Sequence, residues 1–246
     1  MFIPKILKLT LAASCLLALS AQAAGPDYTD YARLLESYAT DDGVDYAAWH
    51  GQTADVDALN DFVTQLGQSD LAELNRSEQK ALYINLYNAA MLQAVLEHYP
   101  IESVTQIGLI PFRVFKQDFI PLGGEKVSLD TVEKGILLKQ FFDPRIHFAV
   151  NCASESCPPL RSEPFTAQNL EAQLDEQTRL FADSDRAARV DTKGKTIAYS
   201  ELFKWYANDF DGDNPAEYLN HYRIKPLPLS YETDWIDYDW SLNETR

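Results

Sequence analysis

Apolar residues recur every three or four positions in several stretches of the chain, a spacing that predicts amphipathic helices with one buried face. We expect such helices over residues 27–39, 54–66 and 166–182. In the third helix, the side chains predicted to face inward are Leu170, Leu174, Leu180 and Phe181. These helices are therefore expected to form much of the core.

One longer helix is predicted to be buried on most of its sides. Asn75 and Glu78 have the spacing of a capping box, and Pro100 ends the helix near residue 99. Apolar residues cover nearly every side of it, which is typical of a helix that is buried all round. Two polar residues, Asn85 and Asn88, interrupt the pattern on nearly the same face.

Most of the predicted extended segments are shorter and follow the long helix. Asp130 and Glu133 have the spacing of a second capping box, which predicts a short helix ending at Gln140. The run RIHFAVN, residues 145–151, is the strongest strand prediction. The other predicted elements are a hairpin of 112–122 and 126–129 around Gly123-Gly124, a strand at 196–199, a helix at 200–210 and closing strands at 227–231 and 235–240.

Helices and strands do not alternate regularly, which favours an α+β fold over a doubly wound sheet. We expect a single domain over residues 24–246, with several helices packed on a small, mainly antiparallel sheet. No repeat and no Pro/Gly-rich linker marks a second domain.

The first 23 residues have the pattern of a secretory signal peptide. Lys5 and Lys8 precede an apolar run, and Ala21-Gln22-Ala23 resembles a cleavage site. We therefore expect cleavage near Ala23 and a periplasmic or secreted protein, with no membrane span in the mature chain. Cys15 would be removed with this segment, leaving two cysteines.

The net charge of the chain limits the classes of partner that it can bind. The chain has 21 Lys and Arg against 37 Asp and Glu, a formal net charge of −16. Such an acidic excess argues against nucleic acid or anionic lipid as a main partner. We expect a small molecule or a peptide instead, and no motif predicts a cofactor or a metal.

Two stretches carry candidate chemistry. Asn85 and Asn88 must find hydrogen-bond partners if they are buried, either in neighbouring backbone or in a site where they orient a catalytic group or hold a substrate. The run DPRIHFAVNCASESCPPL, residues 143–160, combines Arg145, His147 and two cysteines. A thiol beside an imidazole becomes a thiolate nucleophile near neutral pH.

These stretches resemble an uncharacterised family, number 547 among the domains of unknown function, with bacterial and plant members. The resemblance extends over most of the mature chain and rests on YINLYNAAMLQAVL, GGEKVSLDTVEKGIL, DPRIHFAVNCASESCPPL, SELFKWYANDF and YDWSLN. It implies a fold family and a site region around His147, but no reaction.

Two functions remain open. In a thiol-dependent hydrolase or acyltransferase, Cys157 would be the nucleophile and His147 the base, because strand alternation places Cys152 on the face opposite His147. The candidate third members are Glu133, Asn88 and Asn85, and the candidate substrate contacts are Arg145, Asn85 and Asn151.

The alternative is a non-catalytic periplasmic binding or scaffold protein. In an oxidising compartment an even number of cysteines favours a disulfide, here between Cys152 and Cys157. Such a bond would hold the loop together and remove the nucleophile. A metal site built from His147 and the two cysteines is a minor reading, because their spacing fits no common zinc pattern.

Overall fold

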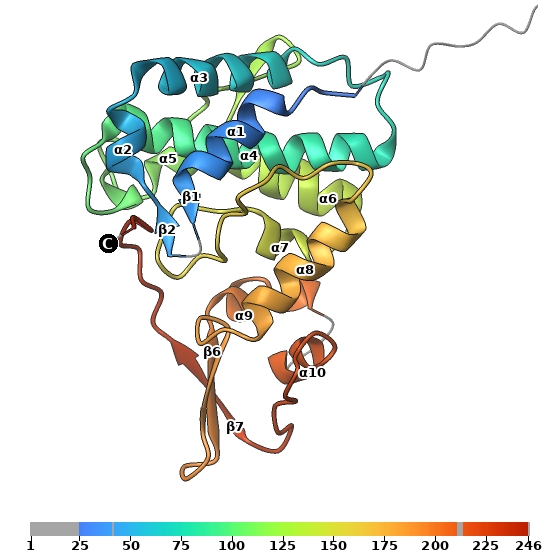
Figure 1. Cartoon of the computed structure of the whole chain (residues 1–246). Coiled ribbons are helices and arrows are strands. Elements are labelled where there is room, and N and C mark those ends of the chain that lie inside the picture. Colours follow the sequence, from blue (N-terminus) through green and yellow to red (C-terminus); the bar gives the residue numbers. More distant parts are fainter. Residues whose placement is uncertain (1–24, 41, 211–213, 246) are drawn as a thin grey trace, which may run out of the picture.

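The computed structural model describes residues 25–40, 42–210 and 214–245. The predicted signal peptide, with Cys15, lies outside these residues. Figure 1 shows helices from the first half of the chain in one region, and a small sheet with short helices from the last quarter in the other. Each region has its own cluster of buried apolar side chains.

The N-terminal helices cover one side of the first cluster. They are α1 (Thr29–Tyr38), α2 (Tyr46–His50) and α3 (Thr53–Gly67), with a short antiparallel pair, β1 (Ala39–Thr40) and β2 (Gly43–Val44), between α1 and α2. Stacked rings join them, Tyr31 on Phe62 and Tyr38 on Trp49. The helix predictions at 27–39 and 54–66 are confirmed within two residues.

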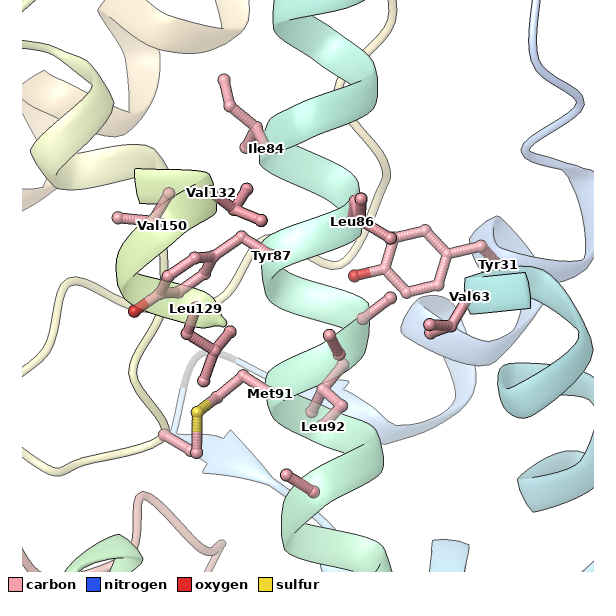
Figure 2. Packing of buried hydrophobic residues seen from close by; sticks show 14 of the residues in the cluster. Tyr31, Val63, Ile84, Leu86, Tyr87, Met91, Leu92, Leu129, Val132 and Val150 are labelled. Atoms are coloured by element: carbon pink, nitrogen blue, oxygen red, sulfur yellow. The ribbon is translucent and has the colours of Figure 1, made fainter. Parts of the chain in front are cut away.

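The long central helix is α4 (Arg76–His98), and its capping box forms as predicted. The Asn75 side chain accepts hydrogen bonds from the backbone of Ser77 and Glu78, while the Glu78 carboxylate accepts one from the Asn75 N–H. Figure 2 shows Leu86 on the side of Tyr31, and Tyr87 on the side of Val132 and Val150. The helix is buried on both sides because its apolar residues run all round it.

The region after α4 is less extended than predicted. Residues 112–119 contain a helical turn, α5 (Arg113–Lys116), after the 3₁₀ turn η1 (Val104–Gln106). The hairpin itself is confirmed: β3 (Ile120–Leu122) pairs with β4 (Glu125–Val127) around Gly123 and Gly124, both at positive φ. Glycine takes that backbone conformation without strain, which is why the turn forms there.

The next helical segment has an unusual backbone. It is a π-helix, η2 (Thr131–Leu137), continued by α6 (Leu138–Phe141). The predicted capping box is wrong: the Asp130 side chain accepts from Lys134, and the Thr131 N–H donates to the Ser128 hydroxyl instead. π-Helical turns are rare and are found frequently at functional sites.

The strand predicted at residues 145–151 is also wrong. Ile146–Ala149 form one helical turn, α7, and Val150, which follows it, is extended. The Asp143 side chain accepts from the Arg145 N–H and begins the turn. All four side chains of the turn are buried, with Ile146 in the first apolar cluster and Phe148 in the second. When a short segment is buried on every side, its apolar residues show neither the helical nor the strand spacing, so the sequence does not distinguish the two structures.

The second region is built on α8 (Leu170–Ala182) and a three-stranded sheet. In the sheet β6 (Thr196–Ser200) lies between β5 (Ala188–Asp191), its antiparallel partner, and β7 (Glu232–Ile236), its parallel partner. The predicted inward position of Leu180 is wrong, since the residue is 56% exposed. The closing strand is Glu232–Ile236 alone, and neither predicted range matches it.

Three short helices complete this region: α9 (Leu202–Trp205), η3 (Ala207–Asp209) and α10 (Pro215–Asn220). The helix predicted over 200–210 is therefore broken at Tyr206, whose backbone is not helical. The α+β class is confirmed, although the antiparallel pairs of the described residues form three small sheets and not one.

Candidate functional site

A pocket of about 420 Å³ lies where the two regions meet, and we call it the site pocket. It receives side chains from α4, α5, η2, α7, α9 and the C-terminal segment. One wall is aromatic and consists of Phe112, Phe115, Trp205, Tyr206, Tyr238 and Trp240. A volume of this size suits a small organic molecule.

The polar side of the pocket contains a buried carboxyl group. Glu133, on the π-helix η2, is only 8% exposed, and its Oε1 accepts a hydrogen bond of 2.8 Å from the Tyr206 hydroxyl. Burial raises the pKa of Glu133, although the hydrogen bond from Tyr206 and the charge of Lys134 act in the opposite direction. A carboxyl group in this setting can exchange a proton with a ligand.

A second titratable group, His147, lies beside the same tyrosine. Its ring is 4.1 Å from the Tyr206 ring, centre to centre, and its Nε2 is 2.8 Å from Oδ2 of Asp209. Burial lowers the pKa of His147, while the hydrogen bond to Asp209 acts against the shift. Asp209 thus takes the position of orienting carboxylate that the sequence analysis gave to Glu133 or an asparagine.

The two cysteines also line the pocket, and they are joined by a disulfide with Cα atoms 6.2 Å apart. The sulfur of Cys152 is 3.2 Å from the Tyr238 hydroxyl. Placing Cys152 on the face opposite His147 is therefore wrong, because α7 is a helical turn and strand alternation does not apply. A bonded sulfur cannot become a thiolate, so Cys157 is not a nucleophile in this state.

The asparagines have backbone partners. The Asn85 side chain donates to the Phe165 carbonyl and accepts from the Phe165 N–H. The Asn88 side chain donates to the Ala149 carbonyl and accepts from the Asn151 N–H, at 2.9 and 2.8 Å. Both amides thus replace the hydrogen bonds that a neighbouring strand would make. Asn88 holds the end of α7 against α4, and Asn85 holds the segment before α8 against the same helix.

Asn151 has a similar place in the loop that carries the cysteines. Its side chain donates to the Pro158 carbonyl and accepts from the Ala153 N–H. Ala153 lies at positive φ, which for a residue with a side chain costs free energy. These bonds hold the loop in the conformation that brings Cys152 and Cys157 to the pocket wall.

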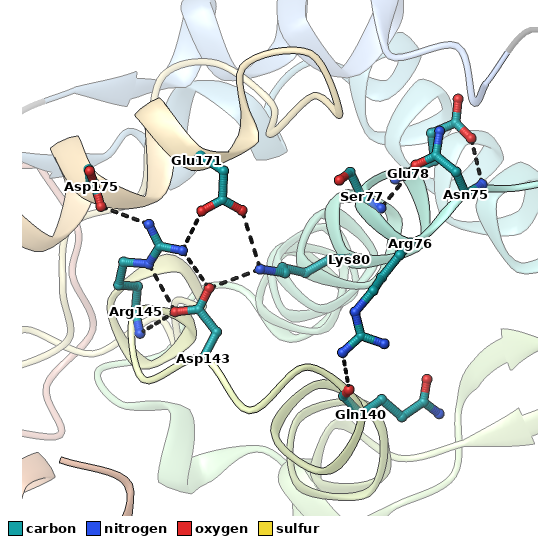
Figure 3. A network of polar contacts seen from close by, with 10 residues as sticks. All are labelled: Asn75, Arg76, Ser77, Glu78, Lys80, Gln140, Asp143, Arg145, Glu171 and Asp175. Carbon is teal, nitrogen blue, oxygen red and sulfur yellow. Dashed lines mark hydrogen bonds and ion pairs between the residues drawn. The ribbon is translucent and has the colours of Figure 1, made fainter. Parts of the chain in front are cut away.

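Arg145 belongs to an ion-pair network at the end of α8 (Figure 3). Its guanidinium donates to Asp143, Glu171 and Asp175, and Lys80 of α4 reaches Asp143 at 2.9 Å. Burial raises the pKa of Asp143, but hydrogen bonds from Arg145 and Lys80 outweigh it and lower the pKa to about 2. The network joins α4 to α8, and Arg145 does not line the site pocket.

Four of the eight residues singled out in the sequence meet at the pocket: Glu133, His147, Cys152 and Cys157. Asn85, Asn88, Asn151 and Arg145 do not line it. Sequence reasoning missed Tyr206 and Asp209 as partners of the buried groups. They are 73 and 62 residues from Glu133 and His147, and no spacing rule connects them.

One comparison with known proteins found a match. The family model described as "Protein of unknown function, DUF547" matches residues 71–182. Residues 71–182 belong to this family. The DUF547 segment contains Glu133, His147 and both cysteines, whereas Tyr206, Asp209 and Tyr238 come from beyond its end. No curated protein and no solved structure matches the chain.

Among the described residues, no helix combines the length and the apolar composition that a membrane crossing requires.

The site pocket is lined from both parts of the chain. The DUF547 segment contributes one side, and the other side comes from residues after 182.

Proposed function

We propose that this is an exported binding protein that holds a small organic ligand in the site pocket, with the Cys152–Cys157 disulfide stabilising one wall. The observation that carries the proposal is Glu133, a buried carboxyl group with a raised pKa that lines an aromatic pocket. Burying a carboxyl group costs free energy, and carboxyl groups with a shifted pKa are found chiefly at functional sites.

The lining indicates the chemistry of the ligand. The aromatic wall suits a molecule with an apolar face, such as a sugar ring, an aromatic ring or a peptide side chain. Glu133 requires a hydrogen-bond donor, either a hydroxyl group or an amine. Lys134 also lines the pocket, but its charge is neutralised by Asp130 at 2.7 Å. The expected ligand therefore has hydroxyl or amino groups on one side and an apolar surface on the other.

Titration calorimetry with sugars, amino sugars, aromatic amines and short peptides tests the proposal. We expect one class to bind, and we expect Glu133→Gln or Trp205→Ala to weaken binding about tenfold. Glu125→Gln is the matched control, because Glu125 is exposed in the hairpin and does not line the pocket. Absence of binding from all four classes would overturn the proposal.

Export is tested separately, on the protein expressed from its full reading frame. N-terminal sequencing of the mature chain should begin near Ala24. Protein that stays in the cytoplasmic fraction and still carries Lys5 and Lys8 would contradict export. It would not affect the ligand-binding proposal.

The second candidate, a thiol-dependent hydrolase or acyltransferase, is favoured by one observation. His147, held by Asp209, and both cysteines line the same pocket. After reduction by a dithiol, Cys157 would attack a substrate carbonyl carbon while His147 takes the thiol proton. His147 would then give this proton to the departing amine or alcohol as its bond to the carbonyl carbon breaks, and water or an acceptor would release the acyl group from Cys157. The products of the reduction are two thiols and an oxidised dithiol.

A thiol count on mature protein purified without reductant separates the two candidates. For the binding protein we expect no alkylation, even after unfolding, and a mass lower by two hydrogen atoms. A thiol that alkylates rapidly in the folded protein, with an apparent pKa below about 8.5, would support the enzyme. In that case His147→Gln should raise the thiol pKa, and His98→Gln, on the outer end of α4, should not.

A further inference from the structure

An apolar loop projects from the protein between η1 and α5. Leu109 is fully exposed and Ile110 is 62% exposed, and these are two of the most exposed large apolar side chains among the described residues. The loop has the composition GLIPF, residues 108–112. Exposed apolar residues that cluster on one loop, instead of being scattered singly, mark an interaction site.

The loop is held from both sides. Ile107 before it and Val114 after it are buried in the first apolar cluster. Gly108 has a φ of 94°, and a Cβ at this position would come within 2.9 Å of the Arg113 side chain. Only glycine therefore fits the turn that directs Leu109 and Ile110 outward.

Aromatic rings cluster at the end of the loop, around Phe112. Phe112 is 39% exposed, and its ring is 4.8 Å from that of Trp240, centre to centre. Trp205 is 45% exposed and stacks on Trp240, with the ring centres 6.0 Å apart. Tryptophan rings with one apolar face and one polar edge are enriched where a hydrocarbon layer meets water.

The charges of α5 and of the whole chain indicate which kind of lipid surface the loop would contact. Arg113 and Lys116 on α5 are exposed, and no ion pair is recorded for either of them within the described parts of the chain. They can contact lipid phosphate groups. The whole chain, however, has a net charge of −16, which repels an anionic surface. The acceptor that satisfies both facts is a zwitterionic lipid surface.

We propose that Leu109, Ile110 and Phe112 insert into a zwitterionic lipid surface, with Trp205 and Trp240 at the headgroup level. A protruding tip suits a soft, flat acceptor, because each inserted side chain gains burial without a complementary groove. Phe112, Trp205 and Trp240 also line the site pocket, so its mouth would open at this surface. The insertion itself does not depend on what the pocket binds.

Flotation of the full mature protein with phosphatidylcholine vesicles tests the proposal. We expect Leu109→Asp and Ile110→Asp each to reduce the vesicle-bound fraction about tenfold or more. Ile224→Asp is the matched control, since Ile224 is 86% exposed and lies after α10, in the other region of the fold. Circular dichroism should show all three variants folded, because none of these side chains is buried.

Lipid charge and salt provide a second readout. Replacing part of the phosphatidylcholine with phosphatidylserine should weaken binding at low salt, and added salt should restore it by screening the repulsion. Absence of flotation with phosphatidylcholine, or equal loss in Ile224→Asp, would overturn the proposal. So would a dimer in lipid-free sedimentation that Leu109→Asp dissociates, since the loop would then bind a second copy of the chain.

Discussion

The central helix and the site pocket both bury polar side chains, but they satisfy them differently. On α4, the amides of Asn85 and Asn88 bond backbone groups, with a donor and an acceptor used on each side chain. In the pocket, Glu133 and His147 bond the side chains of Tyr206 and Asp209. The first arrangement consists of neutral amides and backbone, whereas the second contains groups that gain or lose protons.

The type of hydrogen-bond partner separates buried polar residues that stabilise the fold from those that can take part in proton transfer. Backbone groups cannot move without unfolding the segment, so Asn88 is a structural clamp. Side-chain partners can rotate, and the pKa shifts of Glu133 and His147 show that burial acts against their charged forms. A buried polar residue therefore indicates a site when its partners are side chains in a pocket, and a structural role when they are backbone.

The largest expected effect comes from Asn88→Ala. It leaves the Ala149 carbonyl and the Asn151 N–H without their partner inside the protein. Each unsatisfied group costs on the order of 1–3 kcal/mol, so we expect a loss of roughly 2–6 kcal/mol in the free energy of unfolding by urea. Glu97→Ala, exposed on the same helix, should change it by less than about 0.5 kcal/mol. Equal effects of the two variants would contradict the clamp.

Asp143→Asn tests a half-buried charged group that is paired with Arg145 and Lys80. The pKa of Asp143 is lowered from 3.8 to about 2 in the folded protein, so its charge stabilises the fold above pH 3.8 and stops doing so as the pH falls through 2. A shift of this size corresponds to about 2 kcal/mol.

We therefore expect Asp143→Asn to lower the free energy of unfolding by about 2 kcal/mol at pH 7, and the difference from wild type to disappear near pH 2. Urea unfolding across this pH range measures it. The exposed Asp118→Asn is the control. A difference that stays constant with pH would mean that the ion pairs of Asp143 do not carry its contribution.

The smallest effect, and the only expected gain, comes from Glu133→Gln. Because the folded protein raises the pKa of Glu133, ionisation opposes folding, and its cost appears as the pH rises through the folded pKa. Glutamine can still accept the Tyr206 hydrogen bond. The variant should therefore match the wild type below pH 4.5 and be more stable at pH 7, as followed by thermal unfolding at several pH values. A loss of stability at pH 7 would show that the ionised carboxylate stabilises the fold.

The local sequence pattern was sufficient to predict the helices in which the apolar spacing of three or four residues extends over a long run and the ends are marked. The range of α4 and the capping box of Asn75 and Glu78 follow from spacing and from Pro100, and the same holds for α1, α3 and the Gly123-Gly124 hairpin. It was also sufficient to locate three pocket residues, His147, Cys152 and Cys157, because unusual residue types lie close together in the run from Asp143 to Leu160.

Local pattern failed where burial on all sides removes the period, as at α7, and where a distant group competes for a cap. Glu133 has the spacing of a capping residue, yet it bonds Tyr206, which the second region brings to the pocket. Likewise, His147 finds Asp209 and not the asparagines, since the backbone already occupies their amides. Which side chain meets which depends on how two apolar clusters close on each other, and this is a property of packing that no short stretch of the chain contains.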